Sequence, residues 1–142
     1  MIGNLDDDAL KGIMPKAFTH IFSAITVQKE EKGVQYLIRS SFIEIYNEEV
    51  RDLLSKYFVV IISFLDNDPN KPRKLEIKED PNKGVYIKDC LIKIANTSQD
   101  LENNLKNGNK HKSVGETQMN RDSSRSHCIF TVYIETSETL KV

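Results

Sequence analysis

Hydrophobic residues first recur at helical spacing after a polar N-terminal segment. Residues 1–12 combine glycine, asparagine and three successive aspartates, so we expect them to form a loop. Apolar side chains then follow at i, i+4, i+7, i+8 and i+11, which places them on one face of an amphipathic helix. They are Met14, Phe18, Ile21, Phe22 and Ile25, and Pro15 falls in the first turn, where proline is tolerated. We expect EEKG at 30–33 to end this helix.

Two later segments have the pattern of buried strands. YLIRSSFIEIY at 36–46 and CIFTVYIE at 128–135 are rich in β-branched and aromatic residues, with few polar positions. Strands of this kind usually lie inside a sheet rather than at its edge. NEEVRDLL at 47–54 follows the first strand and favours a short helical turn capped by Asn47.

Strict alternation of apolar and polar residues marks the segment 75–88, LEIKEDPNKGVYIK. The turn-forming residues at 80–84 interrupt the alternation, which predicts a β-hairpin. Thr97 as N-cap and Asp100 three residues later predict the start of a helix, and Gly108 is a natural stop, so we expect a helix over 97–108. Helices interleaved with strands indicate an α/β layered sheet. Two buried strands do not complete such a sheet, which suggests the middle of a larger domain.

Composition and charge narrow the class of protein. The 142 residues suit one domain, and a net charge of −1 with 39% hydrophobic residues gives no global basic field for nucleic acid or a membrane surface. The longest apolar run, at 57–65, is about half the ~18 residues of a membrane span. The acidic N-terminus does not resemble a signal peptide. Cys90 and Cys128 show no metal or redox spacing, so we expect buried free thiols in a reducing compartment.

The stretch MNRDSSRSHCIF at 119–130 carries the candidate chemistry. A run of Ser, Asp and Arg before a strand is commonly a solvated connection. A hydrolase site at Ser126 and His127 is weakly supported, because no G-x-S-x-G turn is present and neighbouring strand residues point to opposite faces. The third interpretation is a phosphate sensor. Hydroxyls ligate Mg²⁺ and donate to a γ-phosphate oxygen, while an arginine pairs with a carboxylate of a second loop.

The same residues resemble a known family. The order Asn120-x-x-Ser123-Ser124-Arg125-Ser126-His127 matches N-x-x-S-S-R-S-H, the switch I signature of the kinesin motor domain. Further segments resemble kinesin segments in the right order: GIMPKAFTHIF, SFIEIYNEEVRDLL, LEIKEDPNKGVYIKD and GNKHKSVGETQMN. Their residues are most similar to those of the kinesin-2 type. The resemblance covers nearly the whole chain. It implies a partial, P-loop NTPase-like layered sheet with helices on both faces.

The resemblance also implies roles for single residues. Ser124 would reach the Mg²⁺ and the γ-phosphate of ATP, and Ser123 would hold the attacking water through its backbone. Asn120 would support the loop beside the nucleotide, and Arg125 would pair with a glutamate of switch II. Catalysis would then consist of positioning and charge stabilisation.

A second set of implied contacts concerns the microtubule. The hairpin at 75–88 resembles the kinesin loop that touches tubulin, so Lys78, Lys83 and Lys88 are candidates for the acidic microtubule surface. Alternating lysines on a hairpin are also ordinary solvent-facing residues. The resemblance implies a cytoplasmic protein on the microtubule cytoskeleton, and any dimer is expected to form through regions outside this chain.

Several expected parts of a motor domain are missing from the sequence. It has no G-x-x-x-x-G-K-[ST] P-loop and no D-x-x-G-x-E switch II. We therefore expect residues 1–142 to be a central part of a kinesin motor domain that is inactive towards ATP alone. The alternative is a truncated, non-catalytic kinesin-like module that binds tubulin or another partner. Residues 56–73 depart from the family as an apolar insertion, for which we expect translated non-coding sequence or, alternatively, an extra strand.

Overall fold

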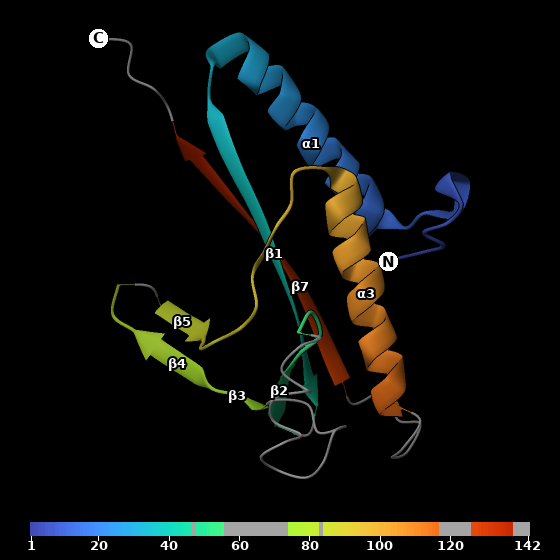
Figure 1. Cartoon of the computed structure of the whole chain (residues 1–142), viewed down its shortest axis with the longest axis vertical. Helices are drawn as coiled ribbons and strands as arrows, with labels where there is room; N and C mark the ends of the chain where they lie inside the picture. The colour runs from blue at the N-terminus through green and yellow to red at the C-terminus, as the bar shows by residue number, and fades with distance from the viewer. Residues whose placement is uncertain (47, 56–73, 83, 117–125, 138–142) are drawn as a thin grey trace. The chain divides into compact units, whose positions relative to one another are not determined.

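The computed structural model describes residues 1–46, 48–55, 74–82, 84–116 and 126–137 (Figure 1). The atypical segment 56–73 lies outside the described residues. The chain divides into two compact units, the first made of residues 1–40, 93–106 and the described residues from 132 on, the second of the described residues within 41–92 and 107–131. The long strands and the second helix contribute residues to both.

Helix α1 (Ile13–Lys32) follows a short 3-10 turn, η1 (Asp8–Leu10), in the otherwise irregular N-terminal segment. Phe18 and Ile25 are buried, which confirms the apolar face predicted from the spacing of hydrophobic residues. The segment before α1 was expected to be a loop, and apart from η1 and a single bridge between Gly3 and Lys11 it is one.

The end of α1 differs slightly from the prediction. Glu30 and Glu31 continue the helix, and Gly33 alone ends it with a left-handed φ of 66°. The Gly33 N–H donates to the Lys29 carbonyl at 3.1 Å. Glycine adopts this conformation without steric cost, so the helix ends where the backbone turns rather than where the charges begin.

Strand β1 is a long, interior strand of the main sheet. Among the described residues this sheet has the order β3-β2-β1-β6, and β7 also pairs with β1. The expected buried strand at 36–46 is therefore confirmed, because neighbours pair with it and its middle is buried. The bounds are β1 (Gln35–Tyr46), β2 (Glu49–Asp52), β3 (Lys74–Leu75), β6 (Lys93–Ile94) and β7 (Ser126–Ser137).

The helical turn predicted over 47–54 is wrong. Glu49–Asp52 forms β2, antiparallel to β1, and Glu48 turns the chain with a φ of 62°. The side chain of Val50 is buried in a cluster with Ile43 and Leu75. Pairing with β1 and burial of Val50 outweigh the local preference for a helical turn. The expected cap, Asn47, lies outside the described residues.

The hairpin is present but shorter than predicted. Strands β4 (Ile77–Asp80) and β5 (Gly84–Ile87) pair antiparallel, and Asp80 opposite Gly84 is the last pair before the turn. Leu75 belongs instead to β3, which pairs with β2. In the turn, the Asn82 N–H donates to Asp80 Oδ1 at 2.8 Å, and Gly84 has a φ of 72°.

Helix α3 (Ser98–Glu116) begins where the sequence predicts and continues past the expected stop. Gly108 lies within the helix instead of ending it. An added Cβ there would lie 2.2 Å from Cδ1 of Phe42, so this glycine allows close packing on β1 rather than a left-handed turn.

Strand β7 is longer than the predicted 128–135 and more exposed. Ile129, Tyr133 and Ile134 are 44%, 38% and 47% exposed, so the expected burial of this strand is not found among the described residues. Neither cysteine forms a disulfide. Cys90 is half-buried, whereas Cys128 is exposed, which corrects the expectation of two buried thiols.

Candidate functional site

The residues with implied catalytic roles are Asn120, Ser123, Ser124 and Arg125. All four lie outside the described residues, as does Lys83 of the hairpin. The structure describes the two elements that flank the segment 117–125, which are α3 before it and β7 after it. The contacts that hold α3 and β7 in place therefore define the described surroundings of the candidate site.

The start of α3 is fixed by a reciprocal cap. The Asp100 N–H donates to Thr97 Oγ1 at 3.2 Å, and Asp100 Oδ2 accepts from the backbone N–H groups of Asn96 and Thr97 at 2.9 Å each. The hydrogen bond from the Asn96 backbone, followed by those from Thr97, lowers the pKa of the Asp100 carboxyl below its usual value. The predicted cap is thus confirmed in its atomic detail.

The middle of α3 packs directly on β1. Phe42 is 2% exposed, and its ring occupies the space that a side chain at position 108 would need. Glycine within a helix is less favourable than alanine, so its presence here has a packing reason. Gly108 is visible in the sequence, but the local preference of glycine for helix ends led to the prediction of a helix end there.

A polar contact holds α3 one turn further along. The ring nitrogen Nδ1 of His111 lies 2.5 Å from the Leu53 carbonyl oxygen, so Nδ1 carries the proton and donates. The Leu53 N–H in turn donates to the Phe42 carbonyl at 2.9 Å. Sequence reasoning missed His111, because its partner lies 58 residues away.

At the start of β7, the structure gives no support to a hydrolase dyad. The buried Oγ of Ser126 has no hydrogen-bond partner among the described residues, and His127 is exposed. Four residues into the strand, the Phe130 ring meets Phe42 edge to face, with centroids 5.3 Å apart and planes at 67°. The β7 flank is therefore seated on β1 by an aromatic pair.

The hairpin presents two of the three candidate lysines. Lys78 Nζ lies 2.9 Å from Glu76 Oε2, and both side chains are exposed. The hydrogen bond with Lys78, together with the charges of Lys78 and Lys88, lowers the pKa of the Glu76 carboxyl, and Glu76 raises the pKa of Lys78. Lys88 is exposed, and its N–H donates to the Glu76 carbonyl at 2.9 Å. Glu76 therefore neutralises part of the positive charge that Lys78 and Lys88 present on the hairpin.

Asp52 joins the end of β2 to the segment after the hairpin. Its Oδ1 accepts from the Leu54 N–H at 2.8 Å, and its Oδ2 accepts from the Leu91 N–H at 2.7 Å. Burial raises the pKa of the neighbouring Cys90 thiol to about 11, and the Asp52 charge adds to the shift. The aspartate of the D-L-L sequence thus has a structural role that spacing alone does not reveal.

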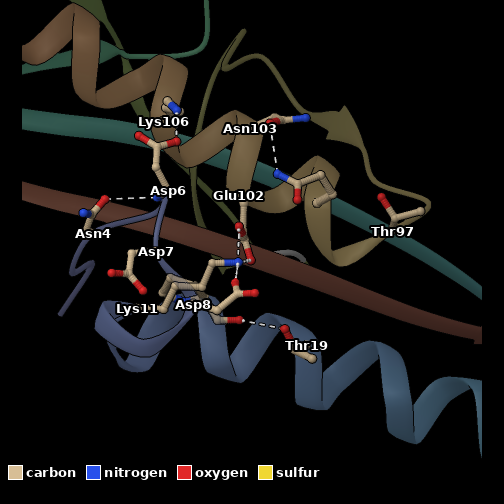
Figure 2. Close-up of polar contacts among 12 residues, drawn as sticks. Asn4, Asp6, Asp7, Asp8, Lys11, Thr19, Thr97, Glu102, Asn103 and Lys106 are labelled. Atoms are coloured by element: carbon tan, nitrogen blue, oxygen red, sulfur yellow. Dashed lines mark hydrogen bonds and ion pairs between the residues drawn. The ribbon is translucent and has the colours of Figure 1, made fainter.

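The acidic N-terminal loop is tied to α3 by ion pairs (Figure 2). Lys11 Nζ lies 2.9 Å from Asp8 Oδ1 and reaches both carboxylate oxygens of Glu102. Lys106 Nζ lies 2.6 Å from Asp6 Oδ1. Figure 2 shows these side chains converging from the loop and the helix. The sequence predicts a loop that contains the three aspartates, but it does not predict the ion pairs of Asp6 and Asp8.

The described residues give no independent support for a metal site or a membrane span. Within the described ranges, no group of three or more His, Cys, Asp or Glu side chains is arranged to hold a metal ion. In the same part of the chain, no helix combines the length and the apolar character needed to cross a membrane. The implied Mg²⁺ ligand, Ser124, lies outside this part, so its fit to the metal rests on sequence alone.

Comparisons with known proteins give one consistent family. The family model for the kinesin motor domain matches residues 1–141. The kinesin-like proteins KIF3C of Mus musculus and Rattus norvegicus are each 42% identical over 138 residues, covering 97% of this chain and 15% of the relative. KIF3C belongs to the kinesin-2 family, which is the type that the motifs of this sequence resemble.

A solved structure adds the fold. A fast kinesin, described with regard to its ATPase mechanism and its interactions with microtubules, has a TM-score of 0.78 at 31% identity. The match covers 97% of this chain and 35% of that one. The expected fold, part of a P-loop NTPase-like kinesin motor, is therefore confirmed. The chain spans only about 15% of the length of the curated relatives it matches.

Proposed function

Because the chain belongs to the kinesin motor domain family, we propose that it supplies the switch I segment and part of the tubulin-facing hairpin of an ATP-dependent microtubule motor. The observation that carries this proposal is N-x-x-S-S-R-S-H at 120–127, in a chain that the family model matches over residues 1–141. Such a protein would act on cytoplasmic microtubules. Residues 1–142 would form the central part of the motor domain.

The proposed chemistry is that of a γ-phosphate sensor. Ser124 would hold Mg²⁺, which supplies charge neutralisation for ATP when bound, and Ser123 would orient the attacking water through its backbone. Asn120 would support the segment, and Arg125 would pair with a carboxylate of switch II supplied by other parts of the motor. These residues would position and stabilise charge rather than form covalent intermediates.

The experiment places this chain in the motor domain of mouse KIF3C, where it replaces the segment to which it is similar. We expect microtubule-stimulated ATPase activity from the chimera. Ser124→Ala should lower kcat by about 100-fold or more, as for loss of a preorganised group at a transition state. Thr136→Ala, an exposed hydroxyl of β7, is the matched control and should leave kcat unchanged. An active Ser124→Ala chimera would remove the metal-ligand role.

A second candidate function is tubulin binding without catalysis. It is favoured by the exposed lysines of the hairpin, Lys78 and Lys88. Co-sedimentation of the 142-residue chain with microtubules tests it over a series of salt concentrations. We expect Lys88→Ala to weaken binding to microtubules and to reduce the salt dependence of that binding. Lys29→Ala, at an exposed position of α1, should do neither. Equal binding by both variants would exclude the hairpin.

Lys78 requires a separate interpretation in that experiment. Its ammonium is paired with Glu76 at 2.9 Å, so Lys78→Ala also leaves a carboxylate on the same surface. The acidic surface of tubulin would repel that carboxylate. We therefore expect Lys78→Ala to weaken binding more than Lys78→Ala combined with Glu76→Gln.

A further inference from the structure

The ring of Phe42 lies between the two elements that flank the segment 117–125. On the α3 side, a Cβ added at Gly108 would lie 2.2 Å from Cδ1 and 2.7 Å from Cε1 of this ring. On the β7 side, Phe130 meets the same ring at 5.3 Å between centroids. A single buried side chain of β1 therefore supports both flanks.

The backbone of Phe42 carries a second link to α3. His111 donates to the Leu53 carbonyl, and the Leu53 N–H donates to the Phe42 carbonyl. Gly108 and His111 are three residues apart, so they lie on one face of the helix. These two contacts on one face oppose rotation of the C-terminal half of α3 about its axis. The C-terminal half of the helix cannot shift without breaking one of them.

The segment between the two flanks is short. Nine residues, 117–125, separate the end of α3 from the first residue of β7. A change in the separation of the flanks must be absorbed by those nine residues. Groups that act by positioning lose rate steeply when they are displaced by about 1 Å.

We propose that Phe42 is a positioning residue, which sets the separation between the end of α3 and the start of β7 by packing against Gly108 and Phe130. The consequence for catalysis rests on the proposed function of the segment 117–125. The geometry itself involves no nucleotide, so it is tested separately.

The first experiment measures the separation by electron paramagnetic resonance between two spin labels. One label is placed on native Cys128, which is exposed, and the other on Lys110→Cys at an exposed position of α3, in a Cys90→Ser background. The 142-residue chain should give one narrow distance distribution. Phe42→Leu and Gly108→Ala should each displace its maximum and broaden it, because one removes the ring and the other forces it away.

The matched control is Phe18→Leu. Phe18 is a phenylalanine of α1 with only 4% exposure, so it matches Phe42 in residue type and in burial. We expect Phe18→Leu to lower the melting temperature and leave the distance distribution unchanged. Unchanged distributions in both Phe42→Leu and Gly108→Ala would overturn the proposal, as would an equal change in Phe18→Leu. A double variant, Phe42→Ala with Gly108→Ala, should show a smaller penalty at position 108, since the obstructing ring is gone.

The second experiment uses the KIF3C chimera and separates the two claims. Phe42→Leu should lower kcat by roughly 10-fold while the KM for ATP changes little, because the ring orders groups that act in the transition state. Phe18→Leu should leave both constants unchanged. A displaced label distance with an unchanged kcat would overturn the link to catalysis. An inactive parent chimera would contradict the proposed function, and the label distances would still decide the role of Phe42.

Discussion

Lys11 and Glu102 are 91 residues apart in the sequence, yet the Lys11 ammonium lies 3.0 and 2.9 Å from the two carboxylate oxygens of Glu102. The Glu102 side chain is 5% exposed and that of Lys11 17%. A carboxylate with so little access to water requires a partner for its charge. This pair therefore fixes the acidic N-terminal loop on α3.

Removing the ammonium should release the loop. We expect Lys11→Met to lower the melting temperature and to accelerate amide exchange at Asn4 and Gly12, whose N–H groups bond within the loop. Lys16→Met, at an exposed position of α1, should do neither. Hydrogen exchange followed by mass spectrometry measures the difference. Equal exchange in the two variants would show that the pair does not hold the loop.

The same pair predicts an effect of alkaline pH. Hydrogen bonds to Asp8 and then to Glu102 raise the pKa of Lys11 above its usual 10.5. A raised pKa stabilises the folded chain below the unfolded value, and this contribution is lost as the pH rises through the folded one. The difference in melting temperature between the parent chain and Lys11→Met should therefore narrow above pH 10.5.

The cap of α3 predicts an effect of acid. We expect Asp100→Asn to lower the free energy of unfolding at pH 7 by about 1 kcal/mol, as loss of a helix cap usually does. Because the folded pKa of Asp100 lies below 3.8, its contribution is present above pH 3.8 and disappears as the pH falls through the folded pKa. Urea unfolding at a series of pH values measures this. A difference from the parent chain that persists at the lowest pH would contradict it.

The control for the cap is Glu30→Gln on α1. Glu30 is exposed and should contribute little to the free energy of unfolding. Its unfolding curve should follow that of the parent chain at every pH, so that any difference seen with Asp100→Asn reflects the cap rather than the loss of one negative charge.

The two thiols should differ in reactivity. Burial raises the pKa of Cys90 from 9.0 to about 11, so its thiolate fraction at pH 8 falls by about 100-fold. Cys128 is exposed. We expect iodoacetamide to modify Cys128 first, with the order read from peptide masses over time. In urea the rates should converge, and comparable rates in the folded chain would contradict the burial of Cys90.

The sequence also predicts a negative result for nucleotide. The 142-residue sequence does not contain G-x-x-x-x-G-K-[ST], the motif that holds the α- and β-phosphates in P-loop proteins. We expect no saturable binding of a fluorescent ATP analogue with Mg²⁺. Micromolar affinity that depends on Mg²⁺ would contradict this prediction, and the chimera serves as the positive control.

Features that depend on nearby residues were predictable from the sequence. Thr97 and Asp100 form the expected cap, because both partners lie within one turn of the helix. The apolar face of α1 and the interior position of β1 also followed from periodicity. In each case, the pattern and the structure it predicts share the same short stretch of chain.

Features that depend on distant partners were not predictable. Residues 49–52 form a strand because β1 offers them a ladder, which local propensity does not register. Gly108 remains helical because Phe42 lies against it, and Lys11 finds its partner in Glu102. For the candidate site, the motif identified the residues, but their geometry depends on contacts from other strands and helices.

The apolar side chains exposed along β7 have a practical consequence for handling the polypeptide. Ile129, Tyr133 and Ile134 meet solvent on a long strand of high β-propensity, which favours self-association as concentration rises. The apparent molar mass from light scattering should therefore increase with protein concentration. Dilute samples, or a fused solubility tag, are the practical way to work with the chain on its own.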